Sequence, residues 1–129
     1  MTEPTTARAI TATQLLQETR AAITDRDHWT VQHMARAFDD APVDVYDHRA
    51  CKFCVHGALM VVRKAHGVHK GYPPPVKRAY NMLRTAAIEL HGHAATSRIN
   101  DFKGHAAILA VLDLAISYGR KPVSGIEGA

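Results

Sequence analysis

Apolar residues recur at helical spacing in five stretches of this chain, and that pattern predicts an all-α protein. Residues three and four positions apart share one face of a helix, so such stretches bury one side against their neighbours. No pair of stretches alternates apolar and polar residues as a β-hairpin would. The predicted helices are one capped by Thr11 or Thr13, one at 30–38, one from about 49–51 to 65, one at 75–91 and one at 105–118.

The last predicted helix, 105–118, is apolar on nearly all sides. A helix of this kind belongs in the interior of a bundle, so we expect a compact bundle of about five helices packed around it. Residues 92–104 are polar and glycine-containing and predict a long loop. The chain of 129 residues is then a single helical domain at 10–119. Flexible tails are expected at 1–9 and 120–129.

The apolar runs of the chain are too short to cross a membrane. The longest, Ala58–Val62 and Ala106–Leu112, fall well below the roughly 20 residues that a membrane span requires. The first sixteen residues place an acid ahead of any apolar segment and lack the layout of a signal peptide. We therefore expect a cytoplasmic protein with no membrane contact.

Charge is distributed unevenly along the sequence. Residues 1–47 hold four basic and eight acidic residues, a net charge of −4, whereas residues 48–129 hold twelve and four, a net charge of +8. No Asp or Glu lies between His48 and Ile88. Basic side chains that share a face attract anions, so this half predicts a basic face for a nucleic acid or another anionic partner. The candidate anion-binding residues are Arg63, Lys64, Lys77, Arg78 and Arg84.

Both cysteines of the chain lie in one short stretch, Cys51–Val62, together with His56. Three interpretations stand side by side. Cys51, Cys54 and His48 have the residue types and spacing of zinc ligands. A cysteine in the first turn of a helix can instead be a reactive thiolate, because the helix dipole lowers its pKa. Two small thiols can also simply pack in the core, so we expect no cofactor and keep zinc as the alternative.

Three motifs in the same order resemble an uncharacterised family of small helical proteins of bacteria and their phages. Cys54-Val-His-Gly57-Ala58-Leu59 is similar to a C-x-x-G-A-L motif, and Ile99-Asn100-Asp101 is similar to a hydrophobic-N-D motif. The apolar helix near the C-terminus is the third. The resemblance covers about 15–118 and implies one compact domain with a site near the first two motifs. The candidate pocket residues are Cys54, His56, Asn100, Asp101 and His105.

The chain contains no complete catalytic signature, and its charge is uneven. These two observations favour a binding protein over an enzyme. The leading hypothesis is a non-enzymatic binding or accessory protein, of bacterial or phage origin, with a protein or nucleic-acid partner. The alternative is a metal-binding or cysteine-dependent enzyme centred on Cys51 and Cys54, with histidines from the loops.

Overall fold

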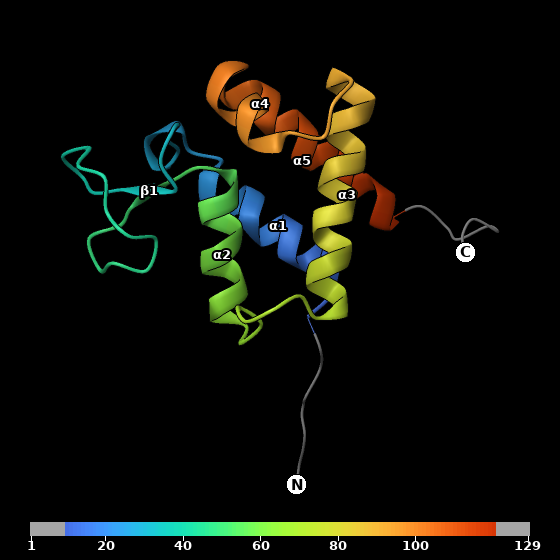
Figure 1. Cartoon of the computed structure of the whole chain (residues 1–129), viewed down its shortest axis with the longest axis horizontal. Helices are drawn as coiled ribbons and strands as arrows, with labels where there is room; N and C mark the ends of the chain where they lie inside the picture. The colour runs from blue at the N-terminus through green and yellow to red at the C-terminus, as the bar shows by residue number, and fades with distance from the viewer. Residues whose placement is uncertain (1–9, 121–129) are drawn as a thin grey trace, which may run out of the picture.

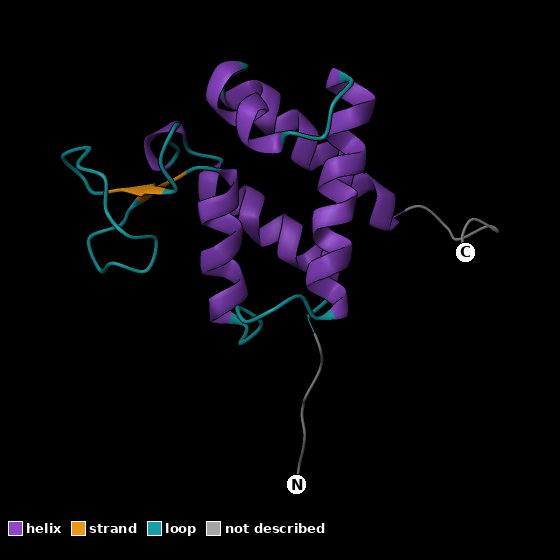
Figure 2. Ribbon diagram, viewed as in Figure 1, coloured by secondary structure: helices purple, strands orange, loops and turns teal. Residues whose placement is uncertain are grey.

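The computed structural model describes residues 10–120 and contains five α-helices and one very short β-hairpin (Figures 1 and 2). This confirms the predicted all-α bundle. The predicted tail at 1–9 and residues 121–129 of the tail predicted at 120–129 lie outside the described residues, whereas Arg120 is the last residue of the final helix. The helices are α1 (Ala12–Ile23), α2 (Val55–Ala65), α3 (Pro74–His91), α4 (Thr96–Phe102) and α5 (His105–Arg120).

Helix α1 lies at the centre of the bundle and contacts α2, α3 and α5 (Figure 1). It begins after Thr11, one of the two predicted caps. The Thr11 side chain accepts a hydrogen bond from the Gln14 amide, and the Gln14 side chain accepts one from the Thr11 amide. Its apolar side carries Leu15 and Leu16, both fully buried.

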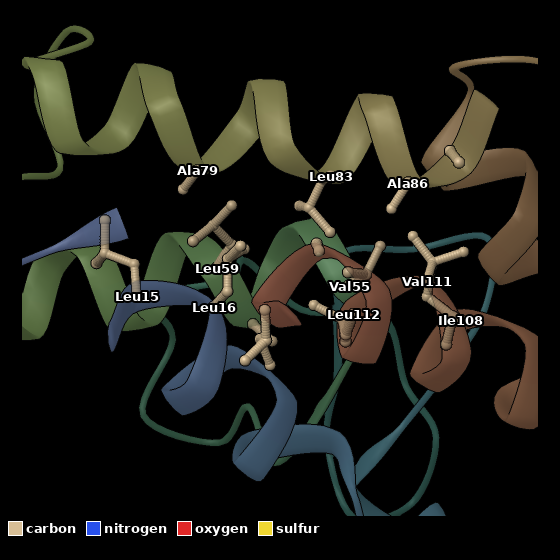
Figure 3. Packing of buried hydrophobic residues seen from close by; sticks show 14 of the residues in the cluster. Leu15, Leu16, Val55, Leu59, Ala79, Leu83, Ala86, Ile108, Val111 and Leu112 are labelled. Atoms are coloured by element: carbon tan, nitrogen blue, oxygen red, sulfur yellow. The ribbon is translucent and has the colours of Figure 1, made fainter. Parts of the chain in front are cut away.

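The core lies where α1, α2, α3 and α5 face one another. In Figure 3, Leu83 of α3 points towards Leu59 and Val55 of α2 and Leu112 of α5. Helix α5 packs against α1, α3 and α4 through fully buried residues that include Ile108 and Leu112. Its opposite side is polar at Asp113, which pairs with Arg20 of α1 at 2.6 Å.

The helix predicted at 30–38 is wrong. Ala35–Arg36 is instead strand β1, which pairs antiparallel with strand β2 at Lys52–Phe53. Of the apolar residues that suggested a buried helical stripe, Phe38 is 89% and Met34 40% exposed, whereas Ala35 is fully buried. Backbone pairing with a distant segment therefore outweighed the local periodicity.

The same pairing shortens the third predicted helix. The sequence predicted a start near 49–51, but Lys52 and Phe53 are held in β2, and α2 begins only at Val55. The segment between α1 and α2 contains a short 3₁₀ helix at Arg26–His28 and projects to one side of the bundle (Figure 1).

The loop predicted at 92–104 is also wrong, since α4 occupies Thr96–Phe102. Two of its residues, Ile99 and Asn100, are fully buried, so tertiary packing stabilises a helix that is short and polar in sequence. Gly92 and Gly104 flank it with φ of 78° and 101°, a backbone conformation that favours glycine. Among residues 10–120, no helix combines the length and apolarity needed to cross a membrane.

Candidate binding pocket

A pocket of about 620 Å³ opens between α2, α3, α4 and the non-helical segment 32–34. This volume lies within the range of small-molecule sites. Three of the five predicted pocket residues, Cys54, His56 and Asp101, line it. The remaining lining comes from Gln32, His33, Met34, Met60, Tyr72, Tyr80, Arg84 and Ser97.

Asn100 lies beneath the pocket, fully buried, and uses its whole side-chain amide. Its Oδ1 accepts hydrogen bonds from Trp29 Nε1 at 2.8 Å and from the Val55 amide at 3.1 Å. Its Nδ2 donates to the Thr30 carbonyl and to Asp101 Oδ1, both at 3.0 Å. Asn100 therefore satisfies a first-turn amide of α2, and it joins α4 to α2 and to the chain at 29–30.

Asp101 fixes the wall of the pocket formed by segment 32–34. Its Oδ1 accepts a hydrogen bond from the Gln32 amide at 2.9 Å. Gln32 has a φ of 68°, an uncommon conformation for a residue with a side chain. The Asp101 contact helps to hold that conformation, which directs Gln32, His33 and Met34 to the pocket.

His105 does not belong to the pocket, contrary to the prediction. The buried imidazole donates through Nε2 to the Ile23 carbonyl at 2.7 Å, and its ring lies 5.0 Å from that of Trp29. This contact joins the start of α5 to the end of α1. Its role is structural, because the polar atom is used by a backbone group within the core.

Cys54 caps the N-terminus of α2, and its thiol is not the reactive thiolate that one interpretation of the sequence required. Its Sγ accepts a hydrogen bond from the Gly57 amide at 3.3 Å, and its own amide donates to the Met34 carbonyl at 3.3 Å. Burial raises the pKa of Cys54, and the hydrogen bond from Gly57 offsets this only in part. The thiol therefore stays protonated at neutral pH.

His56 stands on the α2 side of the pocket as a neutral imidazole. Burial lowers its pKa, although the nearby Asp101 carboxylate acts in the opposite direction. Its Nε2 is hydrogen-bonded to Thr96 Oγ1 at 2.7 Å, so it links α2 to α4. The ring lies nearly parallel to Tyr80, at 6.2 Å and 16°.

The lowered pKa of His56 predicts a stability component that is lost in acid. Protonating the His56 imidazole costs more free energy in the folded protein than in the unfolded chain, where a histidine has a pKa of about 6.5. This component should be fully present above about pH 6.5 and should fall as the pH drops through the folded pKa. We expect His56→Gln, measured by thermal melts at about pH 7.5 and pH 5, to lose less stability on acidification than the wild type.

A histidine in solvent provides the matched control. The His48 side chain is 91% exposed, so His48→Gln should keep the pH dependence of the wild type. If His56→Gln and the wild type lost the same amount of stability on acidification, His56 could not be a buried neutral imidazole.

Three neighbouring rings, those of His56, Tyr80 and Tyr72, form the aromatic wall of the pocket. Tyr72 meets Tyr80 edge to face at 5.8 Å. The Arg63 guanidinium lies 5.4 and 5.8 Å from the centres of these two tyrosine rings. It donates from Nε to the Val68 carbonyl at 3.0 Å and from Nη1 to the Tyr80 hydroxyl at 3.2 Å.

The predicted basic face therefore does not include Arg63, which is buried and holds the proline-rich loop against α2. Lys64 lies with its ammonium 4.4 Å from the centre of the Tyr46 ring. Arg84 lines the pocket, while Lys77 and Arg78 line a neighbouring hollow. Of the five predicted anion-binding residues, these last three lie along the outer side of α3.

The predicted zinc ligands are not assembled in the part of the chain that the structure describes. Within residues 10–120, no three His, Cys, Asp or Glu side chains are arranged to hold a metal ion. Cys54 lines the pocket, Cys51 lines a different hollow beside His28, and His48 lies in solvent next to Asp47. The zinc content of the protein itself stays an untested prediction.

The fold and the pocket together define a small helical-bundle protein with a ligand-sized pocket that has an aromatic wall. The chain belongs to a family of unknown function, DUF6197, whose model matches residues 7–118. Neither a curated protein nor a solved structure matches the chain. The predicted membership of an uncharacterised family is thereby confirmed, and the bacterial or phage origin stays a prediction.

Proposed function

We propose that this protein is a non-enzymatic binding protein, whose partner places a planar group with a negative charge in the pocket. The observation that carries the proposal is the aromatic wall beside Arg84. The rings of His56, Tyr80 and Tyr72 offer stacking surface. Arg84 lines the same pocket, and its guanidinium has no hydrogen bond or ion pair within residues 10–120.

The remaining lining suits binding rather than catalysis on Cys54. Met34 and Met60 supply adaptable apolar surface, and Ser97 supplies a hydroxyl group. The protonated Cys54 thiol is used as a helix cap, and the His56 imidazole is hydrogen-bonded to Thr96. Neither group is paired with the other as a nucleophile and base would be.

Phenyl phosphate is a suitable probe, because it joins one aromatic ring to one anionic group. In an NMR titration, we expect amide shifts confined to α2, α3, α4 and segment 32–34. Arg84→Ala should weaken binding about tenfold, the scale of one charge-assisted hydrogen bond. Arg98→Ala, which removes an exposed charge from α4 outside the pocket, should bind like the wild type.

The two cysteines give a second measurement in the same protein. Bound probe should slow the alkylation of Cys54, which lines the pocket, and leave Cys51 unchanged, because Cys51 lies in another hollow. Shifts scattered over the surface, or equal affinities of Arg84→Ala and Arg98→Ala, would refute the proposed site.

A further inference from the structure

A second hollow, of about 560 Å³, lies along the outer side of α3. Lys77, Arg78 and Asn81 line it, and so does Tyr72, which also lines the first pocket. The two hollows therefore meet at one tyrosine ring, which is 68% exposed. A ligand longer than one planar group can extend from the first hollow into the second across this ring.

Polar and basic residues follow a single stripe of α3 between the two hollows. Lys77, Asn81 and Arg84 are spaced i, i+4 and i+7, which places them on one face of the helix. An α-helix rises about 1.5 Å per residue, so the stripe spans about 10 Å along the helix axis. This length accommodates roughly three phosphates at the axial spacing of a stacked strand.

The cations that line the two hollows are available to a partner: Lys77 and Arg84 lie on the stripe, and Arg78 lies beside Lys77 in the second hollow. Lys77, Arg78 and Arg84 are all exposed, and within residues 10–120 none of them has an ion pair or a side-chain hydrogen bond. This contrasts with Arg20 and Lys52, which pair with Asp113 and Asp40. Three unpaired cations on one helix make a positive track beside the aromatic wall.

Tyr72 is held in place at the junction of the two hollows. The Arg63 guanidinium lies 5.4 Å from the centre of its ring, and the same arginine holds the carbonyls of Val68 and Gly71. The loop that carries Tyr72 is thus anchored by a buried cation, and the exposed ring loses little freedom when a ligand stacks on it.

We propose that the pocket and the α3 track together bind a short single-stranded segment of nucleic acid. One base lies against Tyr80 and His56 in the pocket, a neighbouring base stacks on Tyr72, and the phosphates follow Lys77, Arg78 and Arg84. This inference rests on the proposed function, because it identifies the partner of the same pocket. Asp101 and Ser97 line the pocket that the first base enters, and carboxylate and hydroxyl oxygens accept hydrogen bonds from an N–H group on the Watson–Crick edge of a base, such as N3–H of thymine.

Single-stranded nucleic acid fits these features better than an acidic peptide or a duplex. An acidic peptide would satisfy the three cations but would leave the aromatic wall unused. In a duplex the bases are stacked on one another and cannot lie against protein rings. Alternating rings and cations are the combination by which proteins bind single strands.

The probe is a fluorescein-labelled oligothymidylate of about eight nucleotides, titrated by fluorescence anisotropy over a series of NaCl concentrations. With three phosphate contacts, the logarithm of the association constant should fall linearly with log[NaCl], with a slope of about −2. Lys77→Ala should weaken binding and reduce the slope by about 0.7. Lys103→Ala, which removes one charge outside both hollows, should leave the slope unchanged.

The tyrosine variants separate stacking from charge. Tyr72→Ala should weaken binding about tenfold with an unchanged salt slope, because a stacked ring is lost and no cation is removed. Tyr72→Phe keeps the ring and should bind like the wild type. Since Lys77 lies in solvent, its variant is expected to fold normally and tests the proposal even if Tyr72→Ala is unstable.

Three outcomes would overturn the proposal: no binding at about 50 mM NaCl, a slope that Lys77→Ala does not change, or equal competition by polyglutamate. The last would favour an acidic protein segment as the partner. If phenyl phosphate binds at the pocket and the oligonucleotide does not, the pocket stands and the single-strand proposal fails. If neither binds, both proposals fail.

Discussion

Replacing Asn100 with alanine is expected to lower the free energy of unfolding by about 3–5 kcal/mol, because several buried groups lose their partners at once. Trp29 Nε1 and the Val55 amide lose their acceptor, and the Thr30 carbonyl loses its donor. Each buried polar group left unpaired costs about 1–3 kcal/mol. The loss is a large share of the roughly 5–15 kcal/mol that stabilises a typical domain. Urea denaturation of the purified variant measures it.

Asp101→Asn is the neighbouring control. An amide at this position retains an oxygen that can accept from the Gln32 amide, so we expect a loss of about 1 kcal/mol or less. If Asn100→Ala were no more destabilising than Asp101→Asn, Asn100 could not be the buried junction of α4, α2 and segment 29–30.

Replacing Gly57 with alanine is expected to destabilise the protein by about 3 kcal/mol, although the same change stabilises most helices. Alanine is favoured over glycine inside a helix by about 1 kcal/mol. At this position, however, a Cβ atom would overlap the carbonyl oxygen of Met34, a backbone atom that accepts a hydrogen bond from Cys54. Either α2 or segment 32–34 must shift, which also distorts the pocket. Thermal and urea denaturation together measure the effect.

Gly119→Ala gives the matched comparison within the same protein. Its Cβ would meet the hydroxyl of Thr13, a side chain that can rotate away, so we expect a change below about 1 kcal/mol. Equal losses from the two substitutions would show that α2 does not lie tightly against the Met34 backbone. A stabilised Gly57→Ala variant would lead to the same conclusion.

The sequence was sufficient to predict the helices whose caps and apolar periodicity lie within a few neighbouring residues. Thr11, one of the two candidate caps, caps α1, and α3 and α5 begin within one residue of where the sequence placed them. Cys54, His56 and Asp101 were also predicted to share a site, on a resemblance of motifs, and all three line the pocket. Met60 was missed, although it lies four residues after His56 and therefore on the same face of α2.

The contributions of distant segments could not be obtained from local patterns. Gln32, His33 and Met34 line the pocket because β1 pairs with β2 and because Asp101 accepts from the Gln32 amide. Arg63 was counted as a surface cation because a charge in a basic run is usually exposed. Its burial depends on carbonyls of the loop at 68–71 and on Tyr80, which converge on it only in the folded chain.

The sequence by itself determined the helical class, the start of α1 and the bounds of α3 and α5 to within two residues, because helix periodicity, caps and breakers act over a few neighbouring residues. It also determined the excess of positive charge after His48. Tertiary structure alone decided that 30–38 is not a helix and contains strand β1, that 96–102 is helical and that His105 lies in the core beside Trp29. These outcomes depend on hydrogen bonds and packing between segments up to 82 residues apart, as between His105 and Ile23. Local propensity is too weak to specify contacts at such separations.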